Sequence, residues 1–457
     1  MGGARRALLF VALTVSVLSA ATADSADYSP LVRGGAAAIP FESECGRDGV
    51  GVLTARGHLR RFVLPGKARG LAAAAAGEGG FAVAWRSRGN RAMSARLDPV
   101  TGFAPATDHG PMRPRTESIG PQVAVDQAGR RAVLWEDDHG IRLQRVDAAG
   151  ESGPVLLVRM KRGPEVEDQT GLSPTLQTSG DILWVTWHDP AYDDEEGYKQ
   201  PQLVARRVSA DDSMGSENDL FRPAVGEYVA HAQILGTAPD GRDGLFALIG
   251  FDDDDSDTMD PSGGGPATRT LRVSHLSSSG GVTHRRVAGL NGGHLDGRLA
   301  PVAGGAEVVY NVIRRRRSGI FGRTFDATGR LGRPRLLRRE PENRERNHFV
   351  ADVAGGPRAA HASLLLTTPF RSTERLFLQR RSHDGGLRRI QRVADAGRYR
   401  SGEGAGLSNQ RLALDGRGRA YLTWSRGADL ADAAYARVVR GGRQTPVRAL
   451  WRCPGLG

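Results

Sequence analysis

The pattern that decides the fold is clearest in residues 121–158, which contain Pro121-Gln-Val-Ala-Val-Asp126, Gly129, Ala132-Val-Leu-Trp135, Ile141-Arg-Leu-Gln-Arg-Val146, Asp147-Ala-Ala-Gly150 and Val155-Leu-Leu-Val158. Four short apolar segments alternate here with turns that contain Asp or Gly. A second copy covers residues 411–450, with Ala420-Tyr-Leu-Thr-Trp424 as its second apolar segment. A unit that recurs along one chain indicates a repeat architecture.

The second apolar segment of the unit occurs in seven places. These segments are Phe81–Trp85, Ala132–Trp135, Ile182–Trp187, Leu245–Phe251, Ala306–Ile313, Ala359–Thr367 and Ala420–Trp424. Tryptophan ends four of them, at Trp85, Trp135, Trp187 and Trp424. A turn that contains Gly follows the third segment of each unit, and Gly supplies the positive φ that hairpin turns need.

Short strands, Gly-rich turns and the lack of a long helical periodicity predict an all-β protein. The second segments are continuously apolar rather than alternating, which is typical of strands covered on both faces. Seven units of four such strands resemble a seven-bladed β-propeller, in which each blade is sandwiched between two others. An extra hairpin over residues 49–64 leaves eight blades or six as alternatives. A β-solenoid or a pair of β-sandwiches would also use such strands.

The first 23 residues have the features of a secretory signal peptide. Arg5 and Arg6 precede an apolar run over Ala7–Leu18, and Ala21-Thr-Ala23 is a small-x-small cleavage site. We therefore expect a signal peptide over residues 1–23, a flexible segment over 24–44 and a single propeller domain over 45–453. The mature protein would be a monomer, secreted or held at the cell envelope. No later segment is apolar enough to span a bilayer, so we do not expect an integral membrane protein.

The charge of the chain is strongly basic, with 63 Lys and Arg against 51 Asp and Glu and a formal net charge of +12. The lysines are only Lys67, Lys161 and Lys199, so almost all of the basic residues are arginine. Such a bias resembles high-GC codon usage more than a selected binding surface. Export, mixed charge and the lack of interleaved aromatics argue against nucleic acid as a partner.

The loops between the second and third strands differ in charge from unit to unit. The acidic loops contain Asp137 and Asp138 in the second unit, Asp189, Asp193, Asp194 and Glu195 in the third, and Asp252, Asp253, Asp254 and Asp255 in the fourth. The basic loops contain Arg86, Arg88 and Arg91 in the first unit, Arg314, Arg315 and Arg316 in the fifth, and Arg371 and Arg375 in the sixth. Such loops emerge on one face of a propeller. We therefore expect a dipolar face that is negative over three blades and positive over three others.

Three interpretations fit the acidic loops. The first is that they are solvated surface loops, because charge runs rarely hold a fixed structure alone. The second is a Ca²⁺ site centred on Asp252–Asp255, because calcium prefers oxygen ligands, although the spacing is not that of an EF-hand. The third is a surface that binds a cationic ligand or protein. No cofactor is required by the sequence, and Ca²⁺ is the one ion that it suggests.

Two turns resemble the Asp-box of sialidase-type propellers. Ser382-x-Asp384-x-Gly386 matches its first half and departs at Arg388, whereas residues 277–283 match its spacing without the Asp. Asp-boxes form turns and do not catalyse, so the resemblance implies a fold rather than an activity. Residues 125–129 and 414–418 only echo the turns of quinone-dependent propellers, and we interpret them as strand-connecting turns. The sequence lacks serine-hydrolase, zinc-protease, phosphate-loop and dinucleotide motifs.

These observations favour a non-enzymatic propeller that binds a protein or an anionic polymer of the cell envelope through its dipolar loop face. The alternative is a carbohydrate-active hydrolase or lyase that uses carboxylates of the acidic loops. Glycoside hydrolysis needs two carboxyl groups about 5–10 Å apart, a separation that only a structure can show. The sequence identifies no catalytic residue.

The two cysteines, Cys45 and Cys453, lie near opposite ends of the expected mature chain. Two thiols of an exported protein usually pair, and a closed ring of repeats brings its two ends together. We therefore predict a Cys45–Cys453 disulfide, with two unpaired thiols as the alternative.

Replacing both cysteines by serine should lower the free energy of unfolding by up to about 6 kcal/mol, because the bridge closes a loop of nearly the whole chain. Urea unfolding with and without reductant measures this loss, and the double variant should not respond to reductant. Alkylation of two free thiols in the untreated, folded protein would contradict the prediction.

Overall fold

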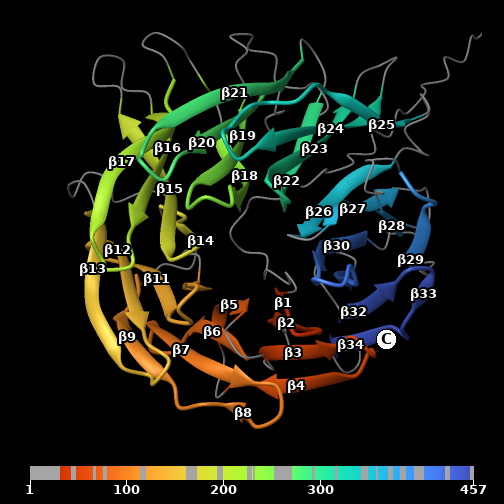
Figure 1. Cartoon of the computed structure of the whole chain (residues 1–457). Coiled ribbons are helices and arrows are strands. Elements are labelled where there is room, and N and C mark those ends of the chain that lie inside the picture. Colours follow the sequence, from red (N-terminus) through yellow and green to blue (C-terminus); the bar gives the residue numbers. More distant parts are fainter. Residues whose placement is uncertain are drawn as a thin grey trace, which may run out of the picture.

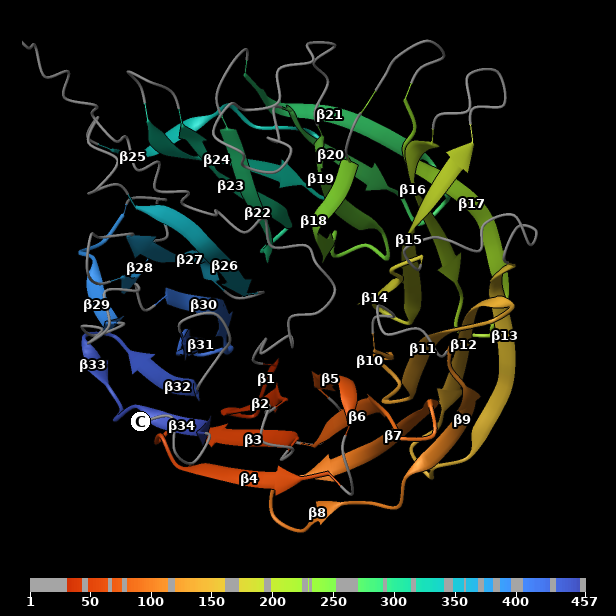
Figure 2. The ribbon, with the colours of Figure 1, turned by 180° about the vertical axis from the view of Figure 1, so that it is seen from behind.

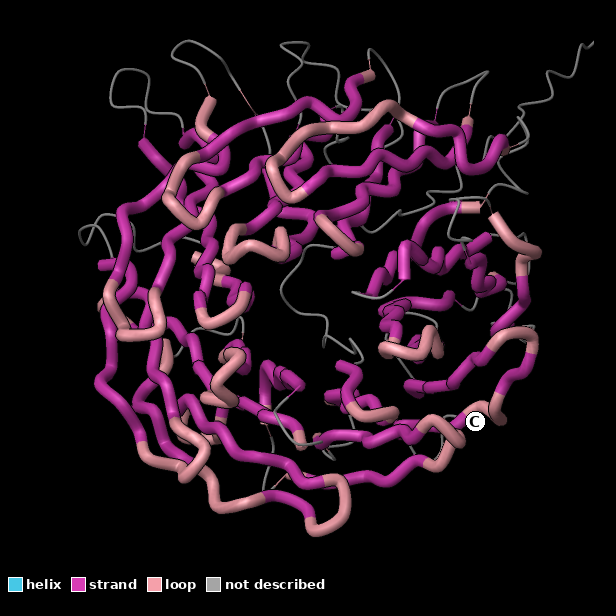
Figure 3. Tube along the Cα trace, viewed as in Figure 1, coloured by secondary structure: helices cyan, strands magenta, loops and turns pink. Residues whose placement is uncertain are grey.

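The computed structural model describes most of the chain beyond residue 30. The described residues are 31–42, 48–64, 68–75, 80–113, 120–160, 172–192, 199–223, 229, 232–251, 270–290, 294–313, 318–340, 348–356, 359–368, 374–380, 387–395, 406–427 and 433–452. Their regular structure consists of strands joined by turns (Figure 3). Within these ranges no helix long and apolar enough to cross a membrane is found.

The first four sheets follow one another along the chain. The first holds β1 (Leu31–Arg33), β2 (Ala36–Phe41), β3 (Gly49–Thr54) and β4 (Leu59–Val63). The second holds β5 (Arg69–Ala75), β6 (Phe81–Arg86), β7 (Arg91–Asp98), β8 (Gly102–Phe103) and β9 (Thr107–Pro111). The third holds β10 (Gln122–Val125), β11 (Arg131–Asp137), β12 (Gly140–Val146) and β13 (Ser152–Met160). The fourth holds β14 (Thr175–Ser179), β15 (Ile182–Tyr192), β16 (Lys199–Val208) and β17 (Met214–Phe221).

The remaining four sheets repeat the same order. The fifth holds β18 (Ala232–Pro239), β19 (Leu245–Phe251), β20 (Thr270–Leu276) and β21 (Val282–Gly289). The sixth holds β22 (His294–Val302), β23 (Gly305–Ile313), β24 (Gly319–Asp326) and β25 (Arg335–Arg339). The seventh holds β26 (Phe349–Gly356), β27 (Ala359–Thr368), β28 (Arg375–Arg380) and β29 (Gln391–Asp395). The eighth holds β30 (Gly406–Leu414), β31 (Ala420–Gly427), β32 (Ala433–Arg440), β33 (Arg443–Gln444) and β34 (Arg448–Arg452).

The sheets stand as blades around a central axis, and the chain is an all-β propeller (Figures 1 and 2). The first strand of each sheet lies next to the axis, and these inner strands neighbour one another in the order β1, β5, β10, β14, β18, β22, β26, β30 and back to β1. Each of the seven expected apolar segments forms the second strand of a sheet. Residues 31–63 add an eighth sheet, so the eight-bladed alternative describes the ring.

The extra hairpin over residues 49–64 is the outer half of this first blade, formed by β3 and β4. Its inner half, β1 and β2, corrects our expectation that residues 24–44 form a flexible segment. The sequence pattern did not indicate strand β2, because Pro40 interrupts it. Proline cannot donate to a ladder, and β1 is so short that it pairs only as far as Ala38.

Buried side chains join each blade to both of its neighbours. The described residues form eight apolar clusters, each of which combines side chains from two adjacent blades. Along β31, Leu422 and Trp424 pack against the seventh blade, whereas Tyr421 packs against the first. Because successive side chains point to opposite faces of a strand, a strand that lies between two neighbours is apolar at every position.

The first and last blades close the ring as two separate sheets. Phe41 of β2 and Trp451 of β34 belong to the same buried cluster, and Arg448 Nε donates to the carbonyl oxygen of Gly57 at 2.9 Å. Cys45 and Cys453 themselves lie outside the described residues, so their pairing remains a prediction. The cluster places the segments that lead to them against each other.

Arginines on the third strands connect the blades in both directions. Arg206 of β16 donates to the carbonyl oxygen of Val158 in the preceding blade. Its neighbour Arg207 donates to the carbonyl oxygen of Ser278 in the following blade. Two adjacent residues can reach opposite neighbours because their side chains leave opposite faces of the strand.

Equivalent arginines repeat these contacts around the ring. Arg323 and Arg437 reach back to the outer strand of the preceding blade, at Val287 and Val393, with N–O distances of 2.7 Å in both cases. Arg380 reaches forward to the carbonyl oxygen of Val439 at 2.9 Å. Part of the arginine excess therefore holds blades together.

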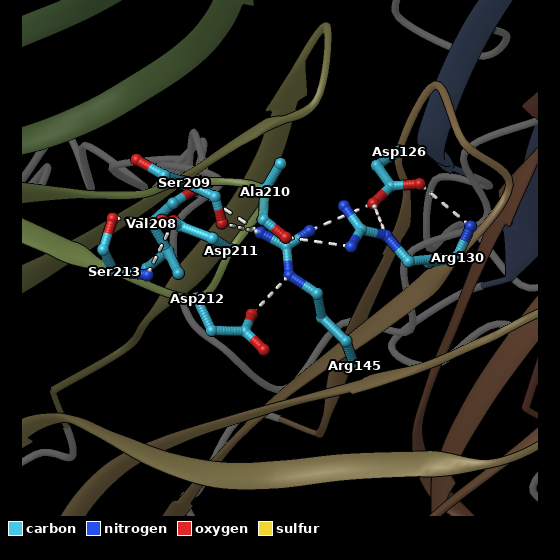
Figure 4. Close-up of polar contacts among 9 residues, drawn as sticks. All are labelled: Asp126, Arg130, Arg145, Val208, Ser209, Ala210, Asp211, Asp212 and Ser213. Atoms are coloured by element: carbon cyan, nitrogen blue, oxygen red, sulfur yellow. Dashed lines mark hydrogen bonds and ion pairs between the residues drawn. The ribbon is translucent and has the colours of Figure 1, made fainter.

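Arg145 makes the most extensive forward contact (Figure 4). Its Nη2 donates to the carbonyl oxygen of Ser209 at 2.6 Å, and its Nε and Nη1 contact the carboxylates of Asp212 at 2.7 Å and Asp126 at 3.0 Å. Asp126 begins the turn after β10, and its other oxygen accepts from the backbone N–H of Arg130. This confirms that residues 125–129 form a strand-connecting turn.

Replacing Arg145 by leucine should lower the free energy of unfolding by about 3 kcal/mol, because it removes one partner of a buried ion pair and exposes carbonyl groups to an apolar side chain. Chemical unfolding monitored by tryptophan fluorescence measures this change.

Arg91→Leu is the matched control. Arg91 pairs with Asp108 at 2.5 Å, but their side chains are 47% and 42% exposed, so its loss should cost less than about 1 kcal/mol. Equal losses in the two variants would show that the bridging role of Arg145 contributes nothing.

Candidate functional site

The loop face is the side of the ring where second strands end, third strands begin and outer strands connect to the next blade. Asp137 ends β11, Asp138 follows it in the turn, and Asp189 lies near the end of β15, so all three are on this face. The other predicted site residues lie outside the described part of the chain: Asp193, Asp194, Glu195, Asp252, Asp253, Asp254, Asp255, Arg314, Arg315 and Arg316.

Asp137 organises the turn that it begins. Its Oδ1 accepts from the backbone N–H groups of His139 at 2.8 Å and Gly140 at 2.9 Å, and its Oδ2 contacts Arg142 Nε at 2.8 Å. Asp138 and His139 are exposed above it. The carboxylate of Asp137 is therefore used within its own blade, and Asp138 is the acidic group presented to solvent.

Asp189 takes part in a contact between two blades. Arg159 of β13 places Nη2 at 2.5 Å from Asp189 Oδ2 and Nη1 at 3.2 Å from Glu217 Oε1. Asp189 is only 7% exposed. This arginine therefore joins the third blade to two carboxylates of the fourth, and Asp189 is a structural anchor as well as part of the loop face.

Two charged residues that directly follow a tryptophan of the second strands are buried, although Arg86 was expected in an exposed loop. Arg86 follows Trp85 and Glu136 follows Trp135, and each is 5% exposed. Arg86 Nη2 donates to the carbonyl oxygen of Arg113 at 2.8 Å, and Glu136 Oε1 contacts Arg113 Nη1 at 3.2 Å. A polar residue directly after the strand-terminal tryptophan therefore anchors the connection between blades.

Charged residues on three adjacent inner strands form a group that the sequence interpretation missed. Arg298 of β22 contacts Asp296 Oδ1 at 2.5 Å and donates to the carbonyl oxygen of Ala351 at 3.1 Å. Asp352 Oδ2 of β26 accepts from the backbone N–H of Leu412 in β30 at 2.7 Å. Burial raises the pKa of Asp352, although the nearby arginines Arg411 and Arg298 act in the opposite direction. The available signal in the sequence was charge within these first strands, which the first strands β10, β14 and β18 lack.

A serine and a histidine lie together in the second blade. Ser94 Oγ is 2.8 Å from His109 Nε2, and His109 Nδ1 is 2.7 Å from Gln144 Oε1 in the next blade. Ser94 is 0% exposed and His109 is 6% exposed, so a substrate could not reach the hydroxyl. This chain of hydrogen bonds therefore joins strands and is not a nucleophile with its base.

No group of three or more His, Cys, Asp or Glu side chains that could hold a metal ion occurs in the described ranges. Asp252–Asp255 lies outside those ranges, so the calcium site remains a prediction.

Comparison with known proteins finds similarity in fold only. No protein-family model matches the chain, and no curated protein matches it in sequence. Among solved structures, dipeptidyl peptidase 4 of Porphyromonas gingivalis is 12% identical with a TM-score of 0.50, covering 96% of this chain and 61% of that one. A post-proline cleaving enzyme from Rickettsia typhi is 9% identical with a TM-score of 0.49, covering 88% and 58%. The protein AztD from Citrobacter koseri is 14% identical with a TM-score of 0.48, covering 91% and 95%.

The chain's own ring of sheets defines the class of the protein as a β-propeller. The likeness to dipeptidyl peptidase 4, at a TM-score of 0.50, agrees with that fold. The chain spans about three fifths of the length of the two peptidases, at 61% and 58%. At such low identity the likeness concerns the fold alone.

The buried histidine makes stability depend on pH. Burial lowers the pKa of His109, although its hydrogen bond to Gln144 acts in the opposite direction. The unfolded chain, with a histidine pKa of about 6.5, therefore binds more protons than the folded protein below that pH. The free energy of unfolding should fall as the pH falls below about 6.5, by at most about 1.4 kcal/mol per pH unit for this one group.

Unfolding titrations at pH 7.5 and 5.5 test this dependence. His109→Gln should be less stable than the parent chain at pH 7.5 but should lose less stability on acidification. His139→Gln, at a side chain that is 77% exposed, is the control and should keep the parent's pH dependence. A His109→Gln variant with an unchanged pH dependence would count against the assignment.

Proposed function

We propose that this protein is an exported, non-enzymatic binding module that acts at the cell envelope and recognises an anionic polymer or a protein through its loop face. The arrangement of arginine–carboxylate pairs on that face carries the proposal. These pairs fix the base of the face, and exposed groups of both signs, such as Asp138 and Arg88, lie in turns on the same face. Charges arranged in this way give specificity and rapid association with a partner of complementary charge.

The same pairs argue against carboxylate catalysis at the described acidic loops. A general acid must approach the oxygen atom that it protonates. The oxygens of Asp137 already contact two backbone N–H groups and a guanidinium, and Asp189 contacts Arg159 in the space between two blades. These carboxylates therefore make structural contacts within and between blades.

One observation favours the alternative of a carbohydrate-active enzyme. Asp352 and Glu374 both have a pKa raised by burial, and both accept hydrogen bonds from β30, at the N–H groups of Leu412 and Leu407. A carboxyl group with a raised pKa is what a general acid requires. The enzyme would then use two carboxyls of the seventh blade, Asp352 on the inner strand β26 and Glu374 directly before β28, rather than the acidic loops.

Binding to a sulfated polymer tests the proposed function. The purified mature chain should bind immobilised dextran sulfate and not neutral dextran, and the affinity should fall as salt rises, because salt screens exposed charges. Reversing Arg314, Arg315 and Arg316 to glutamate should weaken this binding at least about tenfold.

The matched control reverses three exposed arginines in turns on the opposite side of the ring, Arg242, Arg330 and Arg417. The net charge changes equally, so equal weakening would show attraction by overall charge and would contradict recognition by the loop face. Depolymerisation of a polysaccharide panel that disappears in Asp352→Asn would favour the enzyme instead.

A further inference from the structure

The outer strands of the blades form the rim of the ring, where the described sheets end (Figures 1 and 2). The outer strands β9, β13, β17, β21, β25, β29 and β34 each carry a bulge against the third strand of their blade. In β34, for example, Ala449 and Trp451 lie opposite consecutive residues of β32, and the side chain of Leu450 between them is buried. A bulge bends a strand and makes its edge a poor template for pairing with another chain.

The outer strand of the first blade, β4, lacks such a bulge. It pairs with β3 in unbroken register, from Leu59 opposite Leu53 to Val63 opposite Gly49. Within the described part of the chain, no strand pairs with the outer side of β4. A regular strand with an unpaired edge can accept an extended segment of another chain through main-chain hydrogen bonds.

The ladder between β3 and β4 shows which backbone groups point outward. Leu64, directly after β4, donates its N–H to the carbonyl oxygen of Asp48 at 2.9 Å. Hydrogen-bonded pairs alternate with non-hydrogen-bonded pairs along an antiparallel ladder. Leu59, Arg61 and Val63 therefore belong to non-hydrogen-bonded pairs, and their N–H and C=O groups point away from β3.

The side chains of β4 make this edge basic and partly apolar. Arg61 is exposed, and its Nη2 donates to a backbone carbonyl oxygen of the last blade rather than to a carboxylate. Arg60 is exposed too, and its guanidinium lies 5.1 Å from the centre of the Phe62 ring. Val63 is 59% exposed. The edge therefore presents two positive charges beside apolar surface.

The turn after β7 extends this surface. Arg60 Nη1 donates to the carbonyl oxygen of Pro99 at 3.5 Å, and the rings of Phe62 and Phe103 lie 6.4 Å apart in an edge-to-face arrangement. These contacts hold the turn against the side of β4. Val100, which follows Pro99 in the turn, is 70% exposed. An extended segment along β4 would therefore meet apolar side chains as well as backbone groups.

The charge of β4 decides which segment fits its edge. Two copies of β4 paired antiparallel in full overlap would bring the two Arg61 side chains opposite each other, and like charges directly opposite are destabilising. A second copy of this chain is therefore a poor occupant. An acidic side chain opposite Arg61 would instead form a favourable cross-strand pair.

We propose that the edge of β4 binds an extended, acidic segment of a partner protein, which adds an antiparallel fifth strand to the first blade. The segment pairs with the outward backbone groups of Leu59, Arg61 and Val63. It places carboxylates opposite the two arginines of β4 and apolar side chains opposite Leu59 and Val63. The inference goes beyond the proposed function and does not rest on it, because β4 lies on the rim of the ring and not on the loop face.

A fluorescein-labelled peptide with the sequence Ser-Val-Thr-Glu-Glu-Val-Ser tests this pairing. Antiparallel to β4, it places valines opposite Leu59 and Val63 and glutamates opposite Arg60 and Arg61. Fluorescence anisotropy should show saturable binding to the purified mature chain. Two control peptides should bind at least about tenfold more weakly. One carries lysine in place of both glutamates, and the other is N-methylated at the glutamate opposite Arg61 and so lacks an N–H that points to β4.

Arg61→Pro and Arg61→Thr are matched variants that separate the backbone from the charge. Both remove the guanidinium, but only proline removes the outward N–H. An edge strand accepts proline at such a position, so the ladder to β3 should remain. Arg61→Pro should therefore bind the acidic peptide at least about fivefold more weakly than Arg61→Thr. Equal affinities of the two folded variants would contradict strand pairing and would indicate attraction between charges alone.

Hydrogen exchange in the unaltered protein decides the proposal even if a variant does not fold. With saturating acidic peptide, the backbone N–H groups of Leu59, Arg61 and Val63 should exchange at least about tenfold more slowly. Those of Glu217 and Asp219 in β17, an acidic outer strand with a bulge, should exchange at an unchanged rate. Absence of binding, equal binding of either control peptide, or protection elsewhere without a change at β4 would each overturn the proposal.

Discussion

Each blade of this protein is stable only between two others, because its inner strands bury both faces. Leu422 and Tyr421 are neighbours in β31, yet they pack against different blades. The same alternation in β2 directs Ile39 towards the last blade and Ala38 towards the second. No blade can therefore bury its apolar surface alone. The ring must close, and the contact between the first and last blades completes it.

Arginine side chains also make each blade depend on its neighbours, because they donate hydrogen bonds to backbone carbonyl groups of adjacent blades. A guanidinium has several donors in a fixed geometry, so one side chain can satisfy carbonyl groups at the edge of a neighbouring blade. Arg206 and Arg207 do so in opposite directions. The high content of arginine is thus partly structural and is not a matter of codon usage alone. The net charge of +12 overstates the charge available to partners, since Arg86 and Arg145 are each 5% exposed.

The fold could be predicted where the apolar pattern of a segment matches the burial of the strand that it forms. Continuous apolar segments that end in Trp85, Trp135, Trp187 and Trp424 became second strands, because burial on both faces leaves no polar alternation. The first blade was only half recognised, since Pro40 and the short β1 weaken its strand pattern. The loop face was placed correctly for Asp137 and Asp189, but the role of Asp189 depends on Arg159, which lies on another blade.

The sequence by itself determined the strands, their turns and the repeat, because these depend on the alternation of side chains and on residues such as Gly129 and Asp126 within a few positions of one another. Only the tertiary structure decided which polar groups are available for function. Asp352 and Leu412 are far apart in the chain and meet because neighbouring blades pack side by side. Burial at that contact, which no local pattern records, raises the pKa of Asp352.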